Sequence, residues 1–145
     1  MTSAHQTETS NRFDKPRTTG KGWGGGSWIR SSKRWAIYHR DGIECVYCGA
    51  GYTGAASLTL DHVVCRVNGG NNHESNLVTA CNDCNATRKD MALDVFARSR
   101  GLDPALILTK IQAQTSKALD KAQGKILHAQ AKAQNKAQNK AALAA

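Results

Sequence analysis

An Asp–His pair and two Cys-x-x-Cys units are the residues of this 145-residue chain whose types and spacing could do chemistry. Asp61 and His62 stand together in "LTLDHVVCRVNGG", at the end of a stretch patterned like a strand. A carboxylate is a hard oxygen ligand for a divalent cation, and a neutral imidazole accepts a proton from water near neutral pH. Adjacent residues of a regular strand point to opposite faces, so the two can serve one ligand only if the chain bends. The alternatives are a hydrogen-bonded histidine at a strand end and an aspartate that caps a turn.

The four paired cysteines predict a structural zinc site. Cys45 and Cys48 form "CVYC", and Cys81 and Cys84 form "CNDC". Four thiolates bind zinc tetrahedrally, and a core of fewer than about 80 residues usually needs a metal or disulfides. The N-terminus has neither the basic start nor the apolar run of a secretion signal, which favours a reducing, cytoplasmic setting and zinc. Redox-active thiols and an iron–sulfur site are the alternatives, and Cys65 is expected to be a free loop thiol.

Basic residues are concentrated toward the two ends of the chain. Residues 1–40 carry eight Lys or Arg against two acidic residues, and residues 101–145 carry seven against two, whereas residues 41–100 carry five against seven. Basic flanks around a compact module suit a polyanion such as nucleic acid, through attraction that is independent of sequence and sensitive to salt. Membrane lipid and simple solubility are the alternatives, although no apolar run approaches the roughly 20 residues of a membrane helix.

The chain is expected to have three parts. Residues 1–29 are predicted to form a flexible basic arm, because they are rich in glycine and polar residues. Residues 30–101 are predicted to form the domain that carries the cysteines. Residues 102–145 are predicted to form a helical extension rich in Ala, Lys and Gln, in which high helix propensity accompanies lysines at every fourth position.

Within the middle part, the pattern predicts an α+β fold. A short helix from Ser32 should end at Gly42, and strands are expected over 57–60 and 77–80. A helix is expected over 84–101, with a restart at Asp90, and another from Asp103 with Pro104 in its first position. Asn85 opens the first of these helices directly after Cys84. Zinc would anchor that helix start, so the amide oxygen of Asn85 can complete a metal site with Asp61.

As a set, these residues resemble the HNH endonucleases, specifically the small zinc-stabilised type with a ββα-metal fold that is common in phages and bacteria. The segments that carry the resemblance span about 60 residues: "RWAIYHRDGIECVYCG", "LTLDHVV", "NGG", "ESNLVTACNDCN" and "TRK". The resemblance implies that His62 is the general base, that Asn76 holds the loop and orients that base, and that Asp61 and Asn85 bind the catalytic metal, Mg²⁺ or a similar ion. Asn85 stands where many members have His, so the chain is similar to an HNN variant.

The activity implied by the resemblance is metal-dependent hydrolysis of phosphodiester bonds in DNA, by nicking or by double-strand cleavage, with zinc as a structural cofactor. Arg88 and Lys89 follow Asn85 by about one helical turn and are expected to bind phosphates, or else to form a solvated helix face. DNA is the expected partner, in the cytoplasm of a bacterial or phage-infected cell, and a homodimer or a phage or bacterial DNA-processing partner stays open. A zinc-stabilised nucleic-acid-binding module without catalysis, and an interaction protein that uses its C-terminal helix, are the rival hypotheses.

Overall fold

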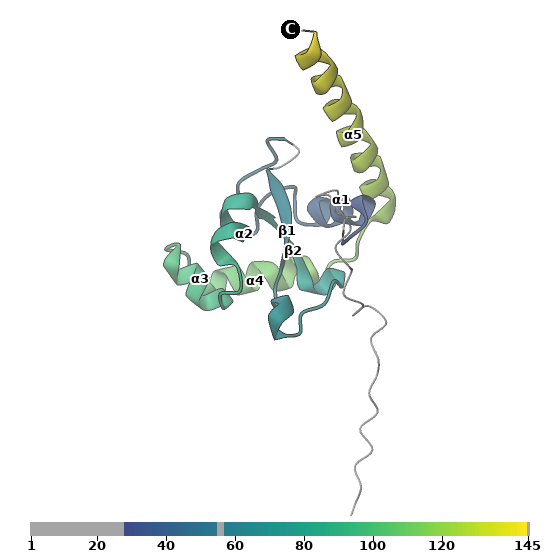
Figure 1. Ribbon diagram of the computed structural model, residues 1–145. Helices are drawn as coiled ribbons and strands as arrows, with labels where there is room; N and C mark the ends of the chain where they lie inside the picture. Colours follow the sequence, from purple (N-terminus) through teal and green to yellow (C-terminus); the bar gives the residue numbers. More distant parts are fainter. Residues whose placement is uncertain (1–27, 55–56, 145) are drawn as a thin grey trace, which may run out of the picture.

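A two-stranded antiparallel sheet lies among the helices of the computed structural model, which describes residues 28–54 and 57–144 (Figure 1). β1 (Leu58–His62) pairs with β2 (Leu77–Cys81), so that His62 lies opposite Leu77. Two short 3₁₀ helices, η1 (Arg66–Asn68) and η2 (Glu74–Asn76), lie in the connection between the strands. The predicted N-terminal arm falls almost entirely outside the described residues.

Five α-helices are found in the described part of the chain: α1 (Ser31–Arg40), α2 (Asn82–Arg88), α3 (Leu93–Ser99), α4 (Pro104–Thr115) and α5 (Lys121–Leu143). α1 is followed by Gly42 at φ +82°, a left-handed conformation that glycine adopts without a steric penalty. Asp103 caps α4 by accepting a hydrogen bond from the Ala105 amide, with Pro104 in the first turn. The mixed α+β fold is confirmed, and β1, β2 and α2 follow one another in the order ββα.

The helix predicted over 84–101 with a restart at Asp90 is two separate helices, and the break lies close to the predicted restart. α2 begins two residues before Cys84, and Lys89 then takes a positive φ of 47°, which ends it. α3 starts only at Leu93, three residues after the predicted restart. Because a side chain with a β-carbon rarely adopts positive φ, the sequence predicted a restart but not the conformation of Lys89 that separates the two helices.

The hydrophobic core continues past residue 101, where the C-terminal extension was predicted to begin. Ile107 and Ile111 of α4 are buried in the same cluster as Val78 of β2 and Phe96 of α3. α4 therefore belongs to the packed body of the protein. The predicted boundary at residue 101 separates helices that share one core.

α5 packs on α1 through its N-terminal half and then extends away from the rest of the described chain (Figure 1). Gly124 lies at the crossing: a β-carbon there would lie 2.7 Å from the β-carbon of Ala36 and still closer to the backbone oxygen of Ser32. Glycine therefore allows the two helix backbones to approach closely. The lysine-bearing C-terminal half of α5 is largely exposed.

A buried ion pair joins the end of α1 to the sheet. Arg40 and Asp41 are bonded side chain to side chain at 2.7 Å, and both are buried. Arg40 donates to the carbonyl of Leu77 at 2.6 Å, and Asp41 accepts from the amide of Thr79 at 2.8 Å. Both bonds act on β2, so α1 fixes the strand against which β1 is aligned.

Candidate functional site

A cavity of about 490 Å³ opens beside the end of β1 and the first turn of α2. Asp61, His62 and Asn85 all line it. The structure therefore brings together three of the residues predicted for a metal and water site, although they come from two different elements. The other lining residues are Trp28, Thr59, Leu60, Cys65, Arg66, Lys89 and Asp90.

Arg88 holds the backbone at the end of β1, next to the residues that line the cavity. Its guanidinium donates to the backbone carbonyl of His62 at 2.6 Å and to that of Val63 at 2.7 Å. Successive carbonyls of a regular strand point in opposite directions, so two adjacent carbonyls can meet one guanidinium only where the backbone turns. The backbone therefore turns directly after His62, and Arg88 stabilises this turn beside the cavity.

The expectation that Arg88 contacts phosphates is wrong, and so is the alternative of a solvated helix face. Arg88 is only 1% exposed, and it donates to Oδ2 of Asp61 at 2.6 Å. Burial by itself lowers the pKa of Arg88, but the neighbouring Tyr47 and Asp61 outweigh it and raise that pKa, so the guanidinium stays charged. Its charge pairs with Asp61 inside the protein. Lys89, by contrast, is exposed and lines the cavity.

Asp61 is buried, at 5% exposure, and both of its protein donors bind the same oxygen. The hydroxyl of Tyr47 donates to Oδ2 at 2.6 Å, beside the bond from Arg88. Burial, with the nearby charge of Asp61, raises the pKa of Tyr47 far above its ordinary value, so this hydroxyl remains a donor. Within the described chain, no hydrogen bond reaches Oδ1 of Asp61. That oxygen is left as a ligand for a cation.

The imidazole ring of His62 is held by a contact to one of its nitrogens and by an aromatic ring stacked on its face. Its Nε2 lies 2.8 Å from Oδ1 of Asn72. An amide oxygen only accepts hydrogen bonds, so Nε2 carries the proton and Nδ1 is the nitrogen of the neutral ring that can take a proton from water. Trp28 stacks on the ring, with centroids 5.0 Å apart. The sequence pattern alone connects neither Asn72 nor Trp28 with His62.

Asn76 holds the loop between the strands, as the resemblance implied, but does so at a distance from the base. Its side chain accepts from the Val64 amide at 2.8 Å and donates to the carbonyls of Val64 and Asn71 at 3.1 and 2.9 Å. None of the hydrogen bonds of Asn76 among the described residues goes to the ring of His62. Asn76 instead fixes the segment that presents Asn72, which does bind the ring.

Asn85 supplies the second oxygen of the candidate metal site. Its Nδ2 donates to the carbonyl of Leu60 at 3.4 Å, and no bond to its Oδ1 is found in the described residues. A carboxylate oxygen and an amide oxygen are ligand types that magnesium and calcium accept. The donor set at this cavity, Oδ1 of Asp61 and Oδ1 of Asn85, therefore fits such an ion.

The four paired cysteines form one cluster that could hold a zinc ion. Their sulfurs all lie within 4.8 Å of one another, and the sulfurs of Cys48 and Cys81 are 3.7 Å apart. Tetrahedral zinc with Zn–S bonds of about 2.3 Å sets its sulfurs about 3.8 Å apart, so the spacing fits. Burial raises the pKa of Cys45 and of Cys84, and the neighbouring cysteines add to the effect at Cys84. Deprotonation of Cys45 and Cys84 is therefore unfavourable until a cation offsets their charge.

Arg100 adds a positive charge beside the cysteine cluster that the sequence analysis did not identify. Its guanidinium lies 3.7 Å from the sulfur of Cys84 and also pairs with Asp83. Donors of this kind, next to the ligands of a metal, orient those ligands and lessen the negative charge of the site. An arginine 16 residues beyond Cys84 carries no local signal of this contact.

The family comparison covers the residues that form both sites. A family model described as HNH endonuclease matches residues 45–99, a range that includes the four cysteines, the Asp–His pair and Asn85. No curated protein and no solved structure gives a match to the chain. None of the helices in the described part is both long and apolar enough to cross a membrane. Residues 45–99 of this chain therefore match the HNH endonuclease family, which supports the resemblance seen in the sequence.

Proposed function

We propose that this domain hydrolyses phosphodiester bonds in DNA with the help of a divalent cation. The observation that carries the proposal is the convergence of Asp61, His62 and Asn85 on one cavity, beside the turn that Arg88 holds. A protein that only binds nucleic acid has no use for an imidazole with a free basic nitrogen beside two oxygen ligands. DNA is proposed as the substrate on the strength of the family and of the basic residues outside the domain.

Each residue then has a distinct task. Asp61 and Asn85 would hold Mg²⁺ or a similar ion, which when bound offsets negative charge developing on the phosphate and the leaving oxygen. His62 takes a proton from the attacking water at Nδ1, because Asn72 keeps the proton of the neutral ring on Nε2. Lys89, exposed at the edge of the cavity, supplies positive charge for a phosphate.

The test compares two histidine variants on supercoiled plasmid, with and without Mg²⁺. General-base catalysis contributes about 10²–10⁴-fold, so His62→Ala should cut at least about a hundred times more slowly while it remains folded and binds DNA. His39→Ala is the matched control, because His39 is exposed on α1 and does not line the cavity. Equal cutting rates for His62→Ala and the wild type would overturn the proposal. Binding without cutting by the wild type, in every divalent cation tried, would favour the non-catalytic module.

The role of Asp61 is best tested with a substitution that keeps a hydrogen-bond acceptor in place of its carboxylate. Removing its carboxylate entirely would leave Arg88 and Tyr47 buried without their acceptor, so loss of activity would be confounded with loss of fold. Asp61→Asn keeps an oxygen for these donors but removes the charge. We expect Asp61→Asn to need more Mg²⁺ and to be partly rescued by it, whereas added Mg²⁺ should not rescue His62→Ala.

A further inference from the structure

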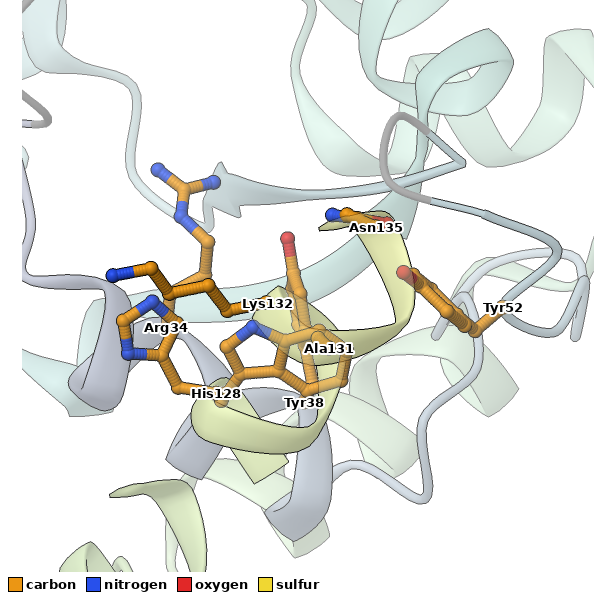
Figure 2. Close-up of a pocket in the computed structure, with 8 residues that line it drawn as sticks. Arg34, Tyr38, Tyr52, His128, Ala131, Lys132 and Asn135 are labelled. Atoms are coloured by element: carbon orange, nitrogen blue, oxygen red, sulfur yellow. The ribbon is translucent and has the colours of Figure 1, made fainter. Parts of the chain in front are cut away.

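A second cavity, of about 370 Å³, lies between α1 and α5, and we call it the α1–α5 pocket (Figure 2). It shares no lining residue with the cavity at Asp61. Its size falls in the lower part of the range of small-molecule sites, about 300–1,000 Å³. The family match does not reach it on α5, because that match ends at residue 99.

One part of the α1–α5 pocket is aromatic. Trp35 meets Tyr38 edge to face at 5.3 Å between ring centroids, and it meets Tyr52 in the same way at 5.4 Å. These contacts fix the rings and leave them lining a cavity. A fixed aromatic ring on a cavity wall is a platform on which a nucleobase stacks, whatever its sequence.

The other part is basic. Figure 2 shows Arg34, His128 and Lys132 at one side of the pocket and Tyr52 at the other. No acidic residue is among those that line it. Aromatic rings with cations beside them match a ligand that has a flat ring and a phosphate, which is a nucleotide. Asn135, also on the wall, can hydrogen-bond to the edge of a base.

A single aromatic ring links this pocket to the proposed catalytic base. Trp28 stacks on His62 at 5.0 Å, and the guanidinium carbon of Arg34 lies over the same indole at 5.7 Å. Trp28 is 42% exposed, so a strand can lie along it. Arg34 is therefore both a wall of the α1–α5 pocket and a neighbour of the residue that covers His62.

We propose that the α1–α5 pocket binds a nucleotide of single-stranded DNA, on the strand whose phosphodiester bond lies at His62. The base stacks on Tyr52, with Trp35, which meets Tyr52 edge to face, beside it, and Arg34 and Lys132 bind the adjoining phosphates. A paired base is stacked inside its duplex and cannot enter, so the nucleotide must be unpaired. The identity of the strand rests on the proposed function, whereas the occupancy of the pocket does not.

Two lysines of α5 allow a matched test with the full chain. Lys132 lines the pocket, whereas Lys136 lies one turn further along the helix and does not line it. Without added divalent cation, the affinity for a fluorescent oligothymidine is expected to fall about tenfold in Lys132→Gln, and about as much in Tyr52→Leu. Lys136→Gln should lose less than about threefold, and both Lys variants should weaken binding to a duplex of the same length equally. Equal effects of the two Lys variants on oligothymidine would overturn the proposal.

Crosslinking of the wild type gives a direct second measurement, which does not depend on whether Tyr52→Leu folds. An oligonucleotide with a photoreactive iodinated uracil should crosslink to Trp35 or Tyr52, as located by mass spectrometry. Crosslinks found only outside the α1–α5 pocket would refute the assignment. Thymidine monophosphate that binds as tightly as the oligonucleotide would show a free-nucleotide site and would refute the strand assignment.

The two proposals fail in different experiments. If the wild type never cuts plasmid but Lys132→Gln still loses oligothymidine selectively, the nuclease proposal fails and the pocket stands. If plasmid is cut and His62 is required, but the two Lys variants behave alike, the pocket proposal fails alone. His39→Ala should bind oligothymidine as the wild type does, because His39 lines neither cavity.

Discussion

Replacing Arg88 by methionine tests whether this buried arginine is what gives the end of β1 its shape. The substitution keeps an unbranched side chain in the core but removes the guanidinium. Asp61 then loses its charged partner, and the carbonyls of His62 and Val63 lose their donors. We therefore expect lower stability together with a disturbed cavity at Asp61 and His62.

The size of the effect follows from burial. Removing one partner of a buried ion pair typically lowers stability by about 3–5 kcal/mol, because the other charge stays buried without a partner of opposite charge. Asp61, at 5% exposure, meets that condition, although Tyr47 still donates to it. Each carbonyl left without a donor costs about 1–3 kcal/mol unless water reaches it, and water can enter from the adjoining cavity. We therefore expect a total near 3–5 kcal/mol, a large share of the roughly 5–15 kcal/mol that stabilises an ordinary domain.

Urea unfolding of the zinc-loaded protein, followed by circular dichroism, measures this change. Lys89→Met is the matched control, because it removes a neighbouring charge that is exposed, and its stability should stay within about 0.5 kcal/mol of the wild type. The double variant Arg88→Met with Asp61→Asn should regain part of the loss, since it no longer buries a charge. If Arg88→Met is less than about 1 kcal/mol less stable than the wild type, the assigned role of Arg88 is wrong.

Three further predictions concern parts of the molecule away from this ion pair. Metal analysis of the reduced protein should find one zinc per chain, with Cys84→Ser losing it and Cys65→Ser keeping it; a folded, zinc-free wild type would contradict this. Gly124→Ala should lower stability by about 1–3 kcal/mol in thermal unfolding, because its new methyl group would overlap α1; the gain normal for Gly→Ala in a helix would show that α5 does not pack there. Changing Lys136 and Lys140 to Gln should lower the slope of log affinity against log salt by about 1.8 for duplex DNA, and an unchanged slope would mean that neither lysine meets a phosphate.

The features that the sequence predicted correctly are those with local causes. Gly42 ends α1 because of its own backbone conformation, and Asp103 with Pro104 starts α4 through bonds within one turn. The two Cys-x-x-Cys units predicted a four-cysteine cluster because the spacing within each unit is typical of a pair of zinc ligands. Asn85 was placed near Asp61 by the same route, since it directly follows a cysteine of the cluster.

The features that the sequence did not predict depend on contacts between distant segments. Arg88 was expected to face solvent or DNA because it follows Asn85 by about one helical turn, yet its partner Asp61 is 27 residues away. Asn72 reaches His62 only because the loop that contains it folds back, and that fold depends on the bonds of Asn76 to Val64 and Asn71. No local pattern marks such contacts. In the sequence alone, an arginine at this position could equally well form an ion pair with a distant buried carboxylate.

α2 shows why the cysteine cluster and the Arg88 network serve the same site. It has seven residues, too few for a helix to be stable alone, so its position must come from what holds its ends. Cys84 fixes its first turn to the cluster, and Arg88 fixes its last residue to the bend of β1. Asn85 lies between these two attachments, so its distance from Asp61 depends on both. Loss of zinc and loss of Arg88 should therefore disturb the same pair of oxygen ligands from opposite ends of one short helix.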